Sequence, residues 1–460
     1  MPKDLRTFLA EIANEVITIR AETDPLTNCG TLISQSPGPL LMENLKGYPG
    51  WRLCDMLLVR RSTQAVALGT TPDRVVPELA SLLAKGGSPT VRVSTGPVKE
   101  KKFIGDNLDL RQLLPVCVHS EIDLQPYIGA GMTIFRDPET GITNSSFIRT
   151  MIRPQQPYPM FIYSPHNNII LKKWWDRGER MPCVLVIGHH PAMEMAVNYL
   201  GPHLSKWGEM ELASTLMREP VEMVPCETVD LEAPARAEIV IEGFIPPEVR
   251  LPEGPFGDFS NNYIPWVSDQ PVLEVTAVTR REDAIYRHIN STMYTDHQAL
   301  MLVTDAMIYD HVVKSTGTDI HEVFRPAWGG GICTVIQMTQ HQDGDAERAM
   351  EAALEFPAGK MIITVDTDID PHIAEDVVFA LSTRVNPSRH INVKHNQAGF
   401  FFDPSSEPIP GKPYYRRQIG RAMINACMPP TSREAERKNY MRARPKGGNR
   451  FMLSDFLPKG

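Results

Sequence analysis

The sequence predicts a loop-rich α/β protein, and three observations support this class. The chain has 460 residues and includes 40 prolines, which fix φ, remove a backbone donor and therefore mark turns between elements. Its middle part, residues 115–300, is rich in short apolar segments bounded by turn residues, a pattern typical of strands. In the last third, strand and helix patterns alternate, which indicates a sheet backed by helices.

The first third is predicted to form a separate α/β unit. Apolar groups recur near helical spacing in residues 4–20, so we expect an amphipathic helix there. Residues 55–67 have the character of a strand and residues 72–85 that of a helix. The unit is expected to end near residues 109–114.

The middle of the chain supplies clear strand signals. Residues 182–188 and 237–243 are short apolar runs, and each predicts a strand. Residues 272–279 and 284–289 flank the charged sequence RRED at 280–283, which predicts an antiparallel hairpin with a charged turn.

The last third predicts strands over residues 332–338 and 361–365 and helices over residues 345–355 and 373–385. Residues 299–314 are apolar and helix-like, which is typical of a linker helix. A basic, polar tail follows residue 433. The expected domains are therefore an N-terminal α/β unit (1–114), a central domain (115–298), a linker helix (299–314) and a C-terminal α/β domain whose tail serves oligomerisation (315–460).

Composition excludes several classes of protein. A net charge of -8 gives no global positive field to attract nucleic acid. The chain contains neither a secretory apolar region at its start nor an apolar run of about 18 residues, so we expect no membrane association. Seven scattered cysteines without a CxxC pair argue against disulfides and zinc clusters, and predict a reducing cytoplasm.

Two segments contain residues suited to acid–base chemistry. Residues 253–258 read EGPFGD, a tight loop that holds Glu253 and Asp258 against an aromatic ring. A carboxylate near apolar surface has a raised pKa, although a solvated turn with surface acids has the same pattern. Arg149 follows apolar residues on an expected strand, where it requires either an ion-pair partner or an anionic ligand.

Two further segments contain polar residues of metal-binding type. Residues 164–168 read SPHNN, and residues 208–213 read GEMELA. Asparagine, histidine and glutamate together suit Mg²⁺ or Mn²⁺, because oxygen donors dominate with one imidazole. Their wide separation in sequence makes a chance grouping easy, so the pattern alone favours exposed polar surface.

Taken together, these four segments resemble the UbiD family of decarboxylases. The resemblance extends over nearly the whole chain, through residues 44–50, 218–228, 233–243, 281–286 and 365–370. It implies that the central domain is a split β-barrel that binds prenylated FMN through a divalent metal on its phosphate. The metal ligands it implies are Asn144, His166 and Glu209, and the cofactor contacts it implies also include Ser146, Phe147, Arg149 and Pro165.

The resemblance implies a carboxy-lyase. Its reaction is a reversible, non-oxidative decarboxylation of an aromatic, heteroaromatic or α,β-unsaturated acid through a covalent adduct with prenylated FMN. Arg149 is expected to hold the carboxylate, Asp258 to supply the proton and Glu253 to tune Arg149. Asp258 stands where other family members have glutamate, a variation that occurs in one branch of the family.

Further expectations follow from the same resemblance. Potassium is expected near residues 201–206, and one of Arg416, Arg417 and Arg421 is expected to reach the cofactor. Independently of the resemblance, the central and C-terminal domains are expected to face each other across a cleft, and position along the chain places parts of residues 290–297 and 324–331 on its substrate side. A flavin prenyltransferase would supply the cofactor, and the chain would form a homodimer or hexamer. Two alternatives remain: a flavin-dependent reductase, and a non-catalytic subunit of a decarboxylase assembly.

Overall fold

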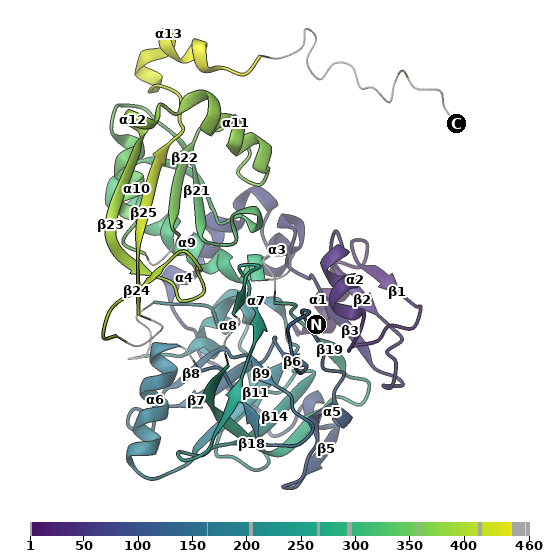
Figure 1. Cartoon of the computed structure of the whole chain (residues 1–460). Coiled ribbons are helices and arrows are strands. Elements are labelled where there is room, and N and C mark those ends of the chain that lie inside the picture. Colours follow the sequence, from purple (N-terminus) through teal and green to yellow (C-terminus); the bar gives the residue numbers. More distant parts are fainter. Residues whose placement is uncertain are drawn as a thin grey trace.

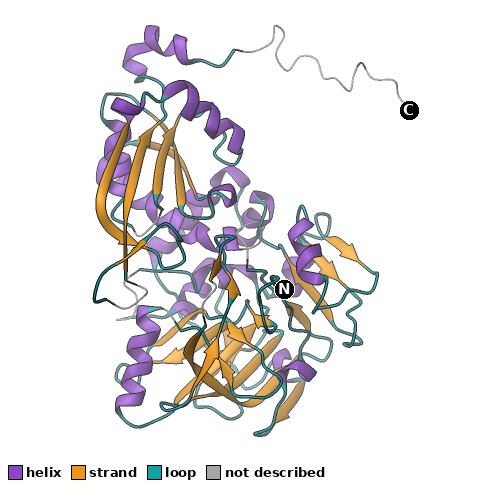
Figure 2. Cartoon of the chain, in the orientation of Figure 1, coloured by secondary structure: helices purple, strands orange, loops and turns teal. Residues whose placement is uncertain are grey.

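The computed structural model describes residues 2–162, 164–201, 206–264, 267–291, 297–356, 359–412, 416–443 and 456. Figure 1 shows an N-terminal unit beside a large central sheet, with a C-terminal α/β domain at the opposite end of the molecule. Helices and strands are mixed throughout (Figure 2). The predicted fold class, with N-terminal, central and C-terminal α/β parts, is therefore confirmed.

The N-terminal unit is a small mixed sheet with helices. Its elements are α1 (Leu5–Glu11), β1 (Ile17–Ile19), α2 (Cys29–Gln35), β2 (Leu40–Met42), β3 (Arg52–Asp55), α3 (Arg61–Leu68) and α4 (Val75–Lys85). The helix predicted over residues 4–20 is shorter than expected, because residues after Ile12 turn into β1, which pairs in parallel with β2.

The strand predicted over residues 55–67 is wrong. The strand β3 ends at Asp55, and the following residues form α3, which buries Ala65, Ala67 and Leu68. This helix ends at Gly69 in the left-handed conformation, with φ of 62°, a position that glycine occupies without steric cost. Packing against α4 therefore outweighs the strand character of the local sequence.

The central part contains one large sheet and several short strands. Its elements are β4 (Val91–Arg92), β5 (Lys101–Ile104), α5 (Leu110–Leu113), β6 (Tyr127–Ile128), β7 (Met132–Arg136), β8 (Thr143–Phe147), β9 (Thr150–Met151), β10 (Tyr158–Pro159), α6 (Pro165–Asp176), β11 (Met181–Ile187), α7 (Pro191–Ala196), α8 (Glu209–Met217), β12 (Glu222–Pro225), β13 (Glu232–Pro234), β14 (Ile239–Ile245), β15 (Arg250–Glu253), β16 (Phe256–Gly257), β17 (Tyr263–Ile264), β18 (Ser268–Arg280) and β19 (Ile285–Arg287). The large sheet has eight strands in the order β10-β18-β14-β11-β7-β8, with β15 and β5 also paired to β18.

The large sheet is buried on both faces. Val184 and Val186 of β11 pack into one hydrophobic core, whereas Leu185 and Ile187 pack into a second core on the other face. Alternate side chains of a strand point to opposite faces. Because both faces are buried, the sequence of β11 is a continuous apolar run. The strands predicted over residues 182–188 and 237–243 are confirmed as β11 and β14.

The predicted hairpin of residues 272–279 and 284–289 is wrong. The strand β19 leaves β18 and pairs in parallel with β3 of the N-terminal sheet. Its last residue, Arg287, is fully buried and donates to Glu194 at 2.7 and 2.8 Å and to Asp55 at 3.4 Å. A buried guanidinium requires such partners, and they lie in the N-terminal sheet and α7 rather than beside β18.

The C-terminal domain is a six-stranded sheet in the order β20-β21-β22-β25-β23, with β24 beside β25. Its elements are α9 (His297–Thr316), β20 (Asp319–Phe324), β21 (Cys333–Thr339), α10 (Asp345–Ala353), β22 (Met361–Val365), α11 (Ala374–Arg384), α12 (Pro387–His390), β23 (Ile391–Gly399), β24 (Glu407–Pro408), β25 (Arg417–Asn425) and α13 (Glu434–Arg437). The four elements predicted after residue 330 are confirmed as β21, α10, β22 and α11.

The long helix α9 joins the parts of the molecule, since it packs against α4 as well as α10 and β20. The predicted domain boundaries stay a prediction; β5 and β19 cross them by pairing with strands of the neighbouring part. Within the described ranges, none of the helices combines the length and apolar character that crossing a bilayer requires. Of the basic tail, the part after residue 443 lies outside the described residues except for residue 456.

Candidate active site

Arg149 and Glu253 form a buried, two-pronged ion pair. Arg149 lies between β8 and β9, and Glu253 is the last residue of β15. The Nε and Nη2 atoms of Arg149 donate to the two carboxylate oxygens of Glu253, each at 2.9 Å. Only 11% of the Arg149 side chain and 1% of the Glu253 side chain are exposed. Planar bidentate geometry makes this pair stronger and more rigid than a single hydrogen bond.

Two phenyl rings enclose the Arg149 guanidinium. Its central carbon lies 4.0 Å from the ring centre of Phe161 and 4.2 Å from that of Phe256. A guanidinium carries five N–H donors in one plane, and the bonds to Glu253 use two of them. The remaining donors lie in the same plane and are not used by Glu253, so a planar carboxylate in that plane can accept from them.

Asp258 is a buried acid beside this pair. Its side chain accepts from the backbone N–H of Phe259 at 2.7 Å, and the residue is 9% exposed. Burial raises the pKa of Asp258; the positive charge of Arg149 and the Phe259 N–H oppose the rise, and the charge of Glu253 adds to it. A carboxyl group with a raised pKa is suited to holding and transferring a proton.

The loop between the two acids is tight, as its sequence predicts. Gly254 has φ of 96°, which favours glycine. After Pro255, the short strand β16 pairs with β17, and the Asp258 N–H donates to the Asn262 carbonyl at 2.9 Å. Both acids are therefore fixed on ordered backbone rather than on a solvated turn.

The three residues expected to bind metal lie on elements that the structure ties together. Asn144 on β8 is 2% exposed and donates to Asn167 at 2.6 Å, and Asn167 is the neighbour of His166 on α6. Glu209 begins α8, and its carboxylate accepts from the Ser145 N–H at 2.6 Å. Close approach of α8 to β8 requires Gly208, because a Cβ there would lie 2.3 Å from the Thr143 carbonyl oxygen.

The donor set fits a hard divalent cation. The Oδ1 atom of Asn144 is buried and has no hydrogen-bond partner among the described residues. An unpaired buried oxygen is unfavourable unless a ligand satisfies it, and amide oxygen, carboxylate and imidazole suit Mg²⁺ or Mn²⁺. In the described part of the chain, histidine, cysteine and acidic side chains alone form no group of three or more that could hold a metal, so a centre here depends on this amide.

The other residues expected to contact the cofactor surround the same elements. Ser146 accepts from Asn167 at 2.6 Å, Phe147 is half-buried at the end of β8, and Pro165 is exposed at the first turn of α6. Of the region expected to hold potassium, residues 202–205 lie outside the described residues.

Arg421 and Arg417 bind backbone and hydroxyl oxygens of the C-terminal domain. Arg421 donates to the carbonyls of Gly359, Leu354 and Phe356. Arg417 donates to the hydroxyl and carbonyl oxygens of Ser406. These bonds hold both guanidinium groups against acceptors inside the C-terminal domain.

The C-terminal domain reaches the candidate site through an aromatic run that sequence reasoning missed. Phe401 lies 5.8 Å from Phe161, between ring centres, and Phe402 lies 4.7 Å from Phe259, the neighbour of Asp258. Three consecutive phenylalanines at 400–402 are an unusual signal that could have drawn attention. In the segments expected on the substrate side, Phe324 lies tilted against His372 with 4.0 Å between ring centres, whereas Gly330 approaches the acid loop, since a Cβ there would lie 3.2 Å from the Ser260 carbonyl oxygen. Residues 292–296 lie outside the described residues.

Tyr127 and Asp123 were also missed, because no local pattern marks them. Tyr127 donates to Glu253 at 3.1 Å, and Asp123 accepts from the Gly257 N–H at 3.2 Å. Both contacts join residues more than 120 positions apart in sequence.

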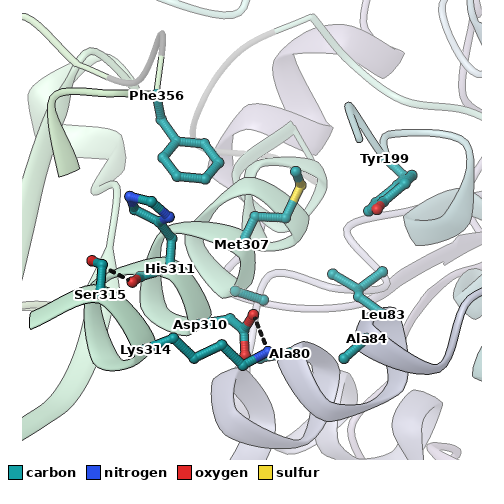
Figure 3. A pocket seen from close by; sticks show the side chains of 11 residues that line it. Ala80, Leu83, Ala84, Tyr199, Met307, Asp310, His311, Lys314, Ser315 and Phe356 are labelled. Carbon is teal, nitrogen blue, oxygen red and sulfur yellow. Dashed lines mark hydrogen bonds and ion pairs between the residues drawn. The ribbon is translucent and has the colours of Figure 1, made fainter. Parts of the chain in front are cut away.

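A pocket of about 390 Å³ lies away from these residues, between α4 and α9 (Figure 3). Its wall combines apolar side chains such as Leu83 and Met307 with the ion pair of Asp310 and Lys314, which are 2.8 Å apart. It contains none of the predicted site residues.

Comparison with known proteins agrees with the fold. A family model described as the 3-octaprenyl-4-hydroxybenzoate carboxy-lyase Rift-related domain matches residues 90–293, and one for the C-terminal domain of the same enzymes matches residues 297–426. The anhydromevalonate phosphate decarboxylase of Methanothermobacter thermautotrophicus is 30% identical over 410 residues, covering 88% of this chain and 93% of that protein.

Solved structures are similar over almost the whole chain. The UbiD-class enzyme HmfF from Pelotomaculum thermopropionicum, in complex with FMN, has a TM-score of 0.88 and 31% identity, covering 99% of this chain and 100% of that one. An evolved dimeric form of HmfF in complex with prFMN has a TM-score of 0.86 and 30% identity, with the same coverage. A 3,4-dihydroxybenzoic acid decarboxylase from Enterobacter cloacae, at 24% identity and a TM-score of 0.87 over 99% of each chain, shares the fold.

These matches define the protein as a carboxy-lyase. The chain belongs to the UbiD family.

Proposed function

We propose that this carboxy-lyase catalyses the reversible, non-oxidative removal of CO2 from an aromatic, heteroaromatic or α,β-unsaturated carboxylic acid. The observation that carries the proposal is the buried bidentate pair of Arg149 and Glu253 beside Asp258, whose pKa burial raises. The pair provides a fixed cation for a carboxylate, and Asp258 provides a proton for the carbon that loses CO2.

Each of the three residues has a separate role. Arg149 receives the substrate carboxylate at the outer edge of its guanidinium, because Glu253 and two phenyl rings hold the rest. Glu253 keeps the guanidinium in one orientation. Asp258 transfers its proton to the substrate carbon, and in the reverse direction it takes the proton back. The rings of Phe161 and Phe256 exclude water from the ion pair, which strengthens its field.

Prenylated FMN is the proposed cofactor, and the flavin complexes of HmfF, one with FMN and one with prFMN, support this choice. When bound, it supplies an electron sink for the electron pair that remains after CO2 departs. Asn144, His166 and Glu209 would hold a divalent metal, Mn²⁺ or Mg²⁺, at its phosphate, and the unpaired Asn144 oxygen supports this assignment. Ser146, Phe147, Arg149 and Pro165 would contact the cofactor, and residues 201–206 would hold potassium.

The proposal extends to partners and location. A flavin prenyltransferase would supply the cofactor in the cytoplasm. A homo-oligomer, dimer or hexamer, is proposed as the working state, and the dimeric form of HmfF supports it.

The experiment that tests this function is a panel of acids, assayed anaerobically with enzyme loaded with prenylated FMN, Mn²⁺ and K⁺. Phenolic, heteroaromatic and acrylic acids are expected to include one that releases CO2 in amounts equal to the decarboxylated product, without consumption of NADH. Reduction of the substrate with NADH consumption would instead identify a flavin-dependent reductase. Purified protein that binds neither flavin nor metal would identify a non-catalytic assembly subunit.

Replacing Glu209 with glutamine is expected to reduce the Mn²⁺ affinity of the purified protein at least about tenfold. Glutamine can still accept from the Ser145 N–H, which Glu209 does at 2.6 Å, so the change removes charge but not the local hydrogen bond. Calorimetric titration with Mn²⁺ measures the loss of metal affinity. Flavin absorbance after purification measures the accompanying loss of bound flavin.

Glu211→Gln is the matched control. Glu211 lies on the same first turn of α8, and its carboxylate accepts from the Gly208 N–H at 3.0 Å. The Glu211→Gln variant is expected to bind Mn²⁺ with the same affinity as the unmodified protein. Equal Mn²⁺ affinity in both variants would contradict the assignment of Glu209 as a ligand.

A further inference from the structure

The segment from His119 to Tyr127 contacts the acid loop at two points. Tyr127 is fully buried, and its hydroxyl donates to Oε1 of Glu253 at 3.1 Å. The same oxygen accepts from Nε of Arg149 at 2.9 Å. Two donors from different parts of the chain therefore fix one carboxylate oxygen, which leaves Glu253 no freedom to rotate away from Arg149 without losing a bond.

The second contact lies next to Asp258. The Oδ1 atom of Asp123 accepts from the Ser120 hydroxyl at 2.7 Å and from the Gly257 N–H at 3.2 Å. Its Oδ2 atom accepts from the N–H groups of His119 and Ser120 at 3.2 and 3.0 Å. The approach is close: a Cβ on Gly257 would lie 2.7 Å from the Ser120 hydroxyl oxygen. Asp123 thus joins its own loop to the residue that precedes Asp258.

A short sheet connects the same segment to Arg149. The strand β6 begins at Tyr127 and pairs antiparallel with β9, with Tyr127 opposite Met151 and Ile128 opposite Thr150. Arg149 immediately precedes β9. The ring of Tyr127 also packs on Phe256, with 4.7 Å between ring centres, and Phe256 covers one face of the Arg149 guanidinium. Tyr127 therefore contacts the surroundings of the Arg149–Glu253 pair through both its backbone and its side chain.

We propose that Tyr127 is a positioning residue for Glu253 and that Asp123 is a positioning residue for Asp258, so that the segment 119–127 fixes both acids relative to Arg149. This inference rests on the proposed function for its kinetic consequences. Burial raises the pKa of Tyr127, so the phenol keeps its proton and remains a donor to the carboxylate. The phenol is a neutral donor, which orients Glu253 without competing with Arg149 as its counter-ion.

Tyr127→Phe tests the first half of the proposal, because it removes the hydroxyl and keeps the ring. We expect kcat to fall about 10- to 100-fold, the range that loss of one hydrogen bond to a charged group predicts. We expect KM to change less than about threefold, since the change removes one donor to Glu253 and no donor of Arg149.

Tyr158→Phe is the matched control for loss of a buried hydroxyl. Tyr158 is also fully buried, but its hydroxyl accepts from the Leu110 N–H at 3.0 Å and lies 3.4 Å from the Leu108 carbonyl oxygen. This variant is expected to lose stability while its kcat and KM stay unchanged. Tyr127→Phe kinetics that match those of Tyr158→Phe would overturn the role of Tyr127.

Asp123→Asn tests the second half without any assay of turnover. The amide nitrogen replaces one carboxylate oxygen and cannot accept from the backbone N–H groups that Asp123 now satisfies. Hydrogen–deuterium exchange of the peptide containing residues 253–258 is expected to become at least about tenfold faster. Asp137→Asn, which changes a comparable turn where Asp137 accepts from the Glu139 N–H at 2.8 Å, is expected to leave that peptide unchanged. Unchanged exchange in Asp123→Asn would overturn the role of Asp123.

Crystal structures of the unmodified protein and of Tyr127→Phe separate this inference from the proposed function. Loss of the bidentate contact between Arg149 and Glu253 in the variant supports the positioning role even if no acid on the panel is decarboxylated. An unchanged bidentate contact overturns it even if decarboxylation is found.

Discussion

Replacing Arg149 with alanine is expected to lower kcat/KM about 10²- to 10³-fold, the effect of removing one preorganised electrostatic group. The guanidinium is the proposed binding group for the substrate carboxylate, and Glu253 and two phenyl rings hold it in one orientation. Stability is expected to fall as well, by about 3–5 kcal/mol, because the change leaves the buried Glu253 carboxylate without its partner. Steady-state kinetics and urea titration measure the two effects.

Two further variants separate charge from geometry. Arg149→Lys keeps a positive charge but loses the planar two-pronged contact, so most of the loss in kcat/KM is expected to remain. Arg180→Ala removes another arginine that stacks on a ring, 3.7 Å from the centre of Phe244, and is expected to leave kcat/KM unchanged. Full activity in Arg149→Lys would show that charge alone is sufficient and would contradict the proposed geometry.

Asp258→Asn is expected to reduce turnover about 10²- to 10⁴-fold without reducing stability at neutral pH. Burial raises the pKa of Asp258, so the folded protein binds this proton more tightly than the unfolded chain does. The resulting stabilisation is fully present below the unfolded pKa of about 3.9. It is lost as the pH rises through the raised pKa. Asparagine carries no ionisable group and can still accept from the Phe259 N–H.

The unfolding midpoint in urea, measured from pH 4 to pH 7, tests the direction of this pH dependence of stability. The midpoint of Asp258→Asn is expected to rise relative to that of the unmodified protein as the pH increases across this range. Asp283→Asn is the control, because the hydrogen bond from Arg6 lowers the pKa of Asp283. The contribution of Asp283 to stability is lost only as the pH falls through that lowered pKa. The difference in unfolding midpoint between Asp283→Asn and the unmodified protein should therefore stay constant from pH 4 to pH 7. A flat difference for Asp258→Asn, or turnover near that of the unmodified enzyme, would count against its role.

The sequence indicated the candidate residues Arg149, Glu253 and Asp258 but not the residues that contact them. Glu253 and Asp258 were identified because two glycines and a proline between acids mark an ordered loop, and Arg149 because an arginine among apolar residues requires a partner. The structure supplies that partner as Glu253, 104 residues away. Tyr127 and Asp123 were missed because a contact across 126 or 134 residues leaves no local period or spacing to read.

Contacts between residues far apart in sequence also explain the errors in the predicted fold. Strands such as β11 and β22 were predicted because all residues of β11, and all of β22 except Met361, are buried and form a short, mostly apolar run. The strand β19 was assigned to a hairpin because the adjacent strand is the usual partner, yet its register follows the buried bonds of Arg287. In α3, the strand character of the local sequence gave way to a helical face that packs on α4.

The pairing of β19 with β3 also sets the order of events during synthesis. Arg287 meets Asp55 across 232 residues of chain. At about 5–20 residues per second, a ribosome needs roughly 10 to 50 s to make that stretch. Throughout this interval the nascent chain presents β3 with one edge unpaired, and an open edge is a template for association with other chains. A fragment that stops before residue 285 keeps that edge permanently, so truncated forms of this enzyme are expected to aggregate where the full chain folds.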